Sequence, residues 1–181
     1  MKKSILLWTK TTYVATFILL MLCFTLSCQQ QAAIEQSEKE MKAMIEKLNN
    51  IWNSGDLAEI EEIFSSNWVC HLNNNEVDTI SIDDYKQWVT SIRTTYPDFT
   101  AKTEQLIIKD DMIMWHWTIT GTHNGTSGDS LLTGKKFKVP GVFIYRVVNG
   151  KIAKEWRFWN NALYLTQLGY TITPPSTAGE K

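Results

Sequence analysis

The chain contains little cysteine and little histidine, with three residues of each among its 181. None of them has the Cys/His spacing of a structural zinc site, so we expect no metal and no other cofactor. The charges nearly cancel, with 18 Lys and Arg residues against 19 Asp and Glu residues. Because the basic residues form no patch and are not interleaved with aromatic residues, the composition argues against a nucleic-acid partner.

The N-terminus has the features of a bacterial export signal. Met1-Lys2-Lys3 gives a basic start, and an apolar run follows from Tyr13 to Leu26. This run is shorter than the stretch of about 20 apolar residues that spans a bilayer. It ends at Ser27-Cys28, and a small residue directly before a Cys resembles a lipobox. The resemblance implies cleavage before Cys28 and lipidation of its thiol. The alternative is an uncleaved anchor with an incidental Cys.

This interpretation predicts a lipoprotein of the bacterial cell envelope, held at the membrane on the periplasmic or extracytoplasmic side. Residues 1–27 would be the signal peptide and residues 28–36 a polar tether. One folded domain would follow over residues 37–170, and residues 171–181 would form a loose tail. With Cys23 removed and Cys28 lipidated, only Cys70 remains, so no internal disulfide forms.

Hydrophobic periodicity predicts helices first and long strands afterwards. Capping-box sequences start at Ser37 and Asp56, and Ser81 caps a third predicted helix. The predicted strands cover residues 67–72, 99–109, 112–123 and 137–148, and a last strand follows Gly150. Strands this long make a sheet curl. We therefore expect an α+β cone, in which a curled, mostly antiparallel sheet carries three N-terminal helices on its concave face.

The last predicted strand is the candidate wall of a pocket inside this cone. It begins after the hairpin signal Asn149-Gly150. Alternation places Trp156, Phe158 and Asn160 on one face, which we predict to face the pocket, and Glu155, Arg157 and Trp159 on the other. We expect Glu155 to pair structurally with Arg157 or with a neighbouring strand.

Several short motifs resemble one known family. The region from about Lys47 to Gly169 resembles the SnoaL-like polyketide cyclases, also called ester cyclases, which have a nuclear transport factor 2-like fold. The motifs that carry the resemblance are Trp52-Asn53-Ser54-Gly55-Asp56, Tyr96-Pro97-Asp98-Phe99, Gly121-Thr122-His123-x-Gly125, Thr133-Gly134-Lys135, Gly150-Lys151-Ile152, Glu155-Trp156 and Gln167-Leu168-Gly169.

The resemblance implies an intramolecular aldol cyclisation of a polyketide ester, with an Asp as acid and base four residues after the Trp of Glu155-Trp156. This chain has Asn160 there. An amide does not titrate and cannot accept the proton. A positioned base contributes about 10²–10⁴-fold to such reactions. The sequence therefore favours a protein that binds a small hydrophobic or polyketide-like molecule over one that cyclises it.

An enzyme remains the alternative if another residue supplies the base. His123 and His71 are the candidates, because the pKa of an unperturbed imidazole lies near neutral. A hydrogen bond that closes the pocket mouth is the other interpretation of His123. A membrane-anchored cyclase, isomerase or hydrolase would then be expected in place of a binding protein.

Aromatic residues are the candidate ligand contacts. Trp115 and Trp117, with Trp156 and Phe158, would form the pocket wall, although a plain core explains the tryptophans equally well. A third hypothesis is a homodimer formed through the outer face of the sheet, with Trp159 and His116 in the interface.

Overall fold

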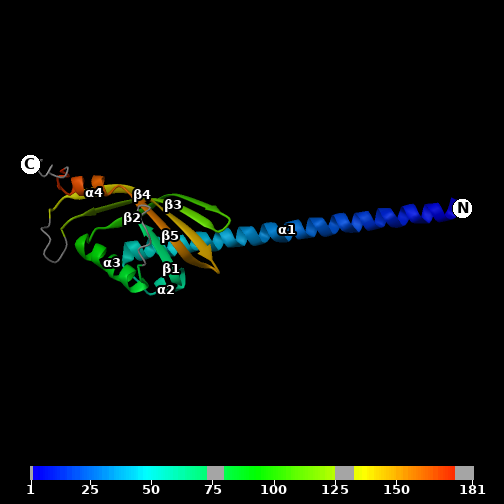
Figure 1. The fold of residues 1–181 in the computed structure, drawn as a ribbon, viewed down its shortest axis with the longest axis horizontal. Coiled ribbons are helices and arrows are strands. Elements are labelled where there is room, and N and C mark those ends of the chain that lie inside the picture. Colours follow the sequence, from blue (N-terminus) through cyan, green and yellow to red (C-terminus); the bar gives the residue numbers. More distant parts are fainter. Residues whose placement is uncertain (1, 73–79, 125–132, 174–181) are drawn as a thin grey trace, which may run out of the picture. The chain divides into compact units, whose positions relative to one another are not determined.

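The computed structural model describes residues 2–72, 80–124 and 133–173 (Figure 1). The chain divides into two compact units, Met1–Lys39 and Glu40–Lys181. The sequence Asn73-Asn74-Asn75, which is typical of a turn, and most of the Gly-, Ser- and Thr-rich stretch 124–130, which is typical of a loop, lie outside the described residues. The helices are α1 (Lys2–Ser54), α2 (Ile60–Ile63), α3 (Ile82–Thr95) and α4 (Asn161–Gln167), and the strands are β1 (Phe64–Leu72), β2 (Thr100–Lys109), β3 (Met112–Thr122), β4 (Lys136–Val148) and β5 (Lys151–Trp159).

Helix α1 runs without a break through Ser37, where the sequence predicts a helix to begin. The predicted tether at residues 28–36 is helical as well. Its Gln, Ala and Glu residues are good helix formers, so a capping sequence behind them does not start a new helix. In the part of the chain that the structure describes, no helix combines the length and apolarity needed to cross a membrane.

The sheet is mixed and open, with the strand order β1-β5-β4-β3-β2. Strands β2 to β5 pair antiparallel, whereas β1 pairs parallel with β5. The hairpin between β4 and β5 turns at Asn149 and Gly150, with φ angles of 52° and 74°. These positive angles are those of a tight hairpin turn, so the predicted turn is confirmed. The predicted α+β class, with a mostly antiparallel sheet and helices, is confirmed too.

The helices of the second unit share one core with the inner face of the sheet. Helix α3 begins at the predicted capping box, in which Ser81 and Asp84 exchange hydrogen bonds. Helix α2 is a single short turn and does not begin at Asp56 as predicted. The Asp56 carboxylate instead accepts from the N–H of Ala58, two residues on, at 3.0 Å. Such an Asx turn competes locally with helix formation.

Two side-chain amides fix helices to strands. The amide of Asn53, in α1, accepts from the N–H of Ala101 at 2.8 Å and donates to its carbonyl at 2.9 Å. Gln167, in α4, makes the same pair of bonds with Lys138 of β4, at 2.7 and 3.1 Å. Asn53 and Gln167 belong to the motifs that carry the family resemblance. In this fold their side chains bind α1 to β2 and α4 to β4.

Candidate functional site: an aromatic cavity

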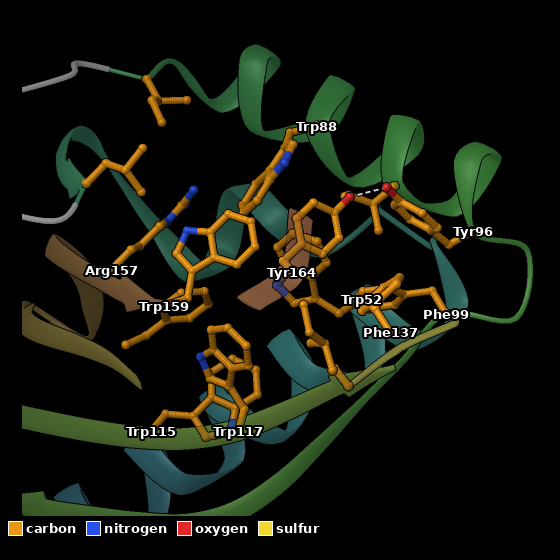
Figure 2. Close-up of a pocket in the computed structure, with 16 residues that line it drawn as sticks. Trp52, Trp88, Tyr96, Phe99, Trp115, Trp117, Phe137, Arg157, Trp159 and Tyr164 are labelled. Atoms are coloured by element: carbon orange, nitrogen blue, oxygen red, sulfur yellow. Dashed lines mark hydrogen bonds between the residues drawn. The ribbon is translucent and has the colours of Figure 1, made fainter. Parts of the chain in front are cut away.

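The helices and the inner face of the sheet enclose a cavity of about 310 Å³ (Figure 2). Most of the side chains that line it are aromatic or aliphatic, and Arg157 is the charged one among them. The cavity is lined by Trp52, Leu72, Ile80, Trp88, Ile92, Tyr96, Phe99, Ala101, Trp115, Trp117, Ile119, Phe137, Phe143, Arg157, Trp159 and Tyr164.

Strand β3 supplies the two tryptophans that the sequence predicts as pocket walls. Trp115 and Trp117 are buried and line the cavity. The Trp115 indole donates to the hydroxyl of Thr103 at 2.9 Å. Trp117 lies over Gly141 on β4, where a Cβ atom would come within 2.2 Å of the indole ring. Glycine at this position therefore creates the space that the Trp117 ring occupies.

Strand β5 faces the cavity with the opposite side from the one predicted. Arg157 and Trp159 line the cavity, whereas Phe158 is 36% exposed. Trp156 stacks on His71 from β1, with ring centroids 5.5 Å apart and planes at 10°. The predicted alternation is correct, but the assignment of its faces is wrong. Trp156 and Phe158 are thus not cavity-lining residues.

The inversion is possible because two opposite charges on β5 neutralise each other. Arg157 donates from Nε to Glu155 Oε1 at 2.7 Å and from Nη2 to Oε2 at 3.0 Å. Both side chains are buried, with 4% and 0% of their surfaces exposed. Burial of a charge is costly unless a partner satisfies it, and a two-point contact of this kind does so. The predicted pairing of Glu155 with Arg157 is confirmed.

Aromatic faces surround the Arg157 guanidinium. Its central carbon lies 4.5 Å from the ring centroid of Trp88, 5.3 Å from that of Tyr85 and between 5.6 and 5.8 Å from those of Phe143 and Trp68. Burial alone would lower the pKa of Arg157, but the charge of Glu155 and its hydrogen bonds outweigh burial and raise it. Arg157 is therefore a fixed cation at the cavity wall.

A pair of tyrosine hydroxyls forms a second polar feature of the wall. The Tyr96 hydroxyl, at the end of α3, is hydrogen-bonded to the Tyr164 hydroxyl of α4 (Figure 2). Burial raises the pKa of both phenols, so both stay protonated at neutral pH. One proton is used within the pair, which leaves one O–H to donate to another acceptor.

Asn160, the position of the family acid and base, lies outside the cavity lining. Its side chain is exposed and caps α4, where its Oδ1 accepts from the N–H of Leu163 at 2.8 Å. Because a helix begins directly after β5, the side chain turns to this helix end. The prediction that Asn160 faces the pocket is wrong.

The two candidate histidine bases do not line the cavity either. His123 is buried, and its Nδ1 accepts from the N–H of Thr133 at 3.4 Å and lies 3.2 Å from the Thr133 hydroxyl. Its ring lies 5.5 Å from that of Tyr96. His71 stacks on Trp156 at the outer face of the sheet. Among the residues described, no cluster of His, Cys, Asp and Glu could hold a metal ion.

Sequence reasoning missed Arg157, Trp159, Tyr96 and Tyr164 as cavity residues. One signal for the first two was present, because Glu155 and Arg157 are opposite charges with one residue between them and therefore share a face of the strand. No comparable local signal joins the two tyrosines, which lie 68 residues apart in the sequence.

A family model places the chain among known proteins. The model of the SnoaL-like polyketide cyclases matches residues 42–168. The chain belongs to the SnoaL-like polyketide cyclase family. The match covers the whole sheet, the C-terminal end of α1, helices α2 to α4 and every residue that lines the cavity.

Solved structures similar to this SnoaL-like protein agree in fold. AclR from Streptomyces galilaeus is 26% identical, with a TM-score of 0.63 over 72% of this chain and 96% of AclR. IdmH from Streptomyces antibioticus is 24% identical, with a TM-score of 0.60 over 71% of this chain and 98% of IdmH. A protein from Catenulispora acidiphila with a ketosteroid isomerase-like fold is 12% identical, with a TM-score of 0.58 over 72% and 97% of the two chains. Among curated proteins, none matches this chain.

The outer face of the sheet in this SnoaL-like protein carries a row of apolar side chains. Trp156, Ile144, Met114 and Ile107 are paired in register across β5, β4, β3 and β2. All four are at least partly exposed. Trp159, which the dimer hypothesis placed on this face, lines the cavity instead.

Proposed function

We propose that this SnoaL-like protein binds a small hydrophobic, polyketide-like molecule in its aromatic cavity and does not cyclise it. The observation that carries the proposal is that the described part of the cavity wall holds no side chain that accepts a proton at neutral pH. Among the described residues, the ionisable groups that line it are Arg157, Tyr96 and Tyr164. Arg157 is held as a cation and both phenols are held protonated. None of the three is a base at neutral pH.

The shape and chemistry of the cavity suit binding. Its volume of about 310 Å³ lies at the lower end of the range of about 300–1,000 Å³ that is usual for small-molecule pockets. Apolar surface that a ligand buries here contributes about 25 cal/mol per Å². The free O–H of the Tyr96–Tyr164 pair would orient a polar substituent of the ligand. We further propose that lipidated Cys28 holds this binding domain at the membrane of the cell envelope.

The alternative function is an enzyme that uses His123 or His71 as base. It has less support, since His123 is engaged with Thr133 and His71 with Trp156. A substrate would have to displace these contacts to reach either imidazole. A histidine-like pH profile of turnover that His123→Ala abolishes would favour the enzyme.

A homodimer is a separate proposal that rests on the apolar row across the outer face. A second copy that covers this row would bury Trp156 and leave the cavity untouched. Sedimentation of the purified protein tests it, and a monomer at micromolar concentration would exclude a dimer of useful strength.

Native mass spectrometry of the protein purified from its host tests the binding function directly. We expect a retained molecule that leaves with no chemical change. Two matched variants on β5 then locate it. Trp159→Ala removes a cavity wall and should weaken binding of an aromatic probe about tenfold or more, because an aromatic side chain buries a large apolar area.

Trp156→Ala is the matched control, because it removes the same side chain from the opposite face of the same strand. Its affinity should stay within about twofold of that of the unchanged protein. Equal losses in both variants, or no binding of any apolar probe, would contradict the proposal. Titrations are made on the full chain in detergent, with the partition of the probe into empty micelles subtracted.

A further inference from the structure

Arg157 keeps a charged donor group at the cavity wall that its contacts with the described residues do not use. Arg157 uses Nε and Nη2 to bind Glu155. Its third nitrogen, Nη1, makes no hydrogen bond to any residue that the structure describes. The side chain is 4% exposed and lines the cavity. A donor of a mostly buried arginine that faces the cavity without an acceptor from the described residues is a site that an acceptor on a ligand would fill.

The guanidinium is also held in place before any ligand arrives. The two-point contact with Glu155 fixes its plane, and the ring of Trp88, 4.5 Å from its central carbon, packs against it. A donor that is already ordered loses little entropy when it binds. The remaining N–H groups of Arg157 therefore have a fixed direction.

The charge balance decides which acceptor fits. Glu155 cancels the charge of Arg157, and among the described residues no other charged side chain lines the cavity. A carboxylate on the ligand would bring one uncompensated negative charge into an aromatic site that already contains Glu155. A neutral carbonyl oxygen accepts the same hydrogen bond and leaves the site neutral.

We propose that Arg157 is the specificity-determining residue of the cavity. Its Nη1 donates to a neutral carbonyl oxygen of the ligand, and Glu155 sets the charge that makes a ketone, quinone or lactone fit better than a carboxylic acid. This inference rests on the proposed binding function and names the class of ligand that the cavity takes.

The second polar feature of the wall lies elsewhere. Figure 2 shows Arg157 and Tyr96 on opposite sides of the cavity, with Trp159 and Trp88 between them. An elongated ligand could therefore contact the arginine through a carbonyl and the tyrosine pair through another oxygen. Among the described residues that line the cavity, Arg157 alone is bonded to a carboxylate, and a change of that carboxylate alters the preferred charge of the ligand.

Three naphthalene probes of similar size test the inference on the full chain at pH 7. They are 2-acetylnaphthalene, 2-ethylnaphthalene and 2-naphthoate, which supply a neutral acceptor, no acceptor and an anionic acceptor. We expect the ketone to bind about tenfold or more tightly than either of the others, as for a hydrogen bond to a charged donor. Equal affinities for ketone and hydrocarbon would overturn the assignment of Arg157.

Glu155→Gln then changes the charge at the arginine end by one unit while keeping the size of the side chain. We expect 2-naphthoate to gain about tenfold or more relative to the ketone, so that the preference reverses. Glu104→Gln is the matched control: Glu104 forms a surface ion pair with Lys102 and does not line the cavity. It should leave the order of the three probes unchanged.

The outcomes separate the two proposals. An unchanged order in a folded Glu155→Gln variant would overturn the role of the pair, while binding itself would stand. If that variant does not fold, the order of the three probes with the unchanged protein decides. Absence of binding for all three probes would overturn the proposed function, and the assignment of Arg157 with it.

Discussion

Replacing Arg157 by Met should lower the free energy of unfolding by about 3–5 kcal/mol, the usual effect of removing one partner from a buried ion pair. We expect the loss in free energy of unfolding to lie near the upper end of this range. Both partners are almost fully buried, and two hydrogen bonds of 2.7 and 3.0 Å are lost together. The aromatic faces around the guanidinium add cation–π contacts, each contributing about 0.5 kcal/mol or more. After the change Glu155 is left buried without its partner.

The double variant Arg157→Met/Glu155→Gln separates the charge from the packing. It removes both charges and keeps most of the side-chain volume, so it should be more stable than Arg157→Met alone by about 2 kcal/mol or more. The four proteins to compare are the unchanged protein, Arg157→Met, Glu155→Gln and the double variant. Their free energies of unfolding are measured in urea at pH 7 by tryptophan fluorescence, all in the same detergent. A loss under about 1 kcal/mol for Arg157→Met, or single effects that simply add in the double variant, would show that Arg157 and Glu155 do not stabilise each other.

Gly141→Ala should displace the Trp117 ring, because the added Cβ lies 2.2 Å from it. We expect the free energy of unfolding to fall by about 1–3 kcal/mol and the aromatic probe to bind more weakly. Burial raises the pKa of Tyr85 and Tyr145 in the folded state. The free energy of unfolding should therefore keep their full contribution below a pH of about 10, where tyrosine in the unfolded chain begins to ionise, and should fall above that pH. An unfolding midpoint that does not change from pH 9 to 11 would contradict this. Asn160→Ala should cost about 0.5–2 kcal/mol through loss of the helix cap and leave probe affinity unchanged, whereas a loss of affinity would return Asn160 to the site.

Local pattern was enough to predict most of the sheet. Strands β2, β3 and β4 begin and end within one residue of the ranges expected from alternation, and the Asn149-Gly150 turn has the expected geometry. These features depend on neighbours in the sequence. The parallel pairing of β1 with β5 does not, since it joins residues more than 80 positions apart.

The inner face of β5 could not be predicted for a physical reason. Alternation tells which residues share a face but not which face is buried. Size favoured Trp156 and Phe158, and charge counted against Glu155 and Arg157. Only the mutual neutralisation of the two charges, inside a cage of aromatic rings from α3, β1 and β4, reverses that preference. The cage forms from segments far apart in the chain.

Asn160 shows the same limit at a single residue. The family motif identifies Asn160 as the acid and base position, but alternation directs its side chain into the cavity only if the strand continues through it. Helix α4 begins directly after Asn160, and the side chain satisfies an N–H of the first helical turn. Asn160 still lacks the titrating carboxyl group of the family Asp, as the sequence predicts, although its side chain lies outside the cavity.

The most direct test of the central claim is fluorine NMR of the protein labelled with 5-fluorotryptophan, recorded with and without 2-acetylnaphthalene. Assignment by single Trp→Phe changes identifies each signal. We expect the probe to shift the signals of the tryptophans that line the cavity, which are Trp52, Trp88, Trp115, Trp117 and Trp159. The signal of Trp156, on the outer face, should stay in place. A shift at Trp156 with none at Trp159 would contradict the cavity assignment and the function proposed from it.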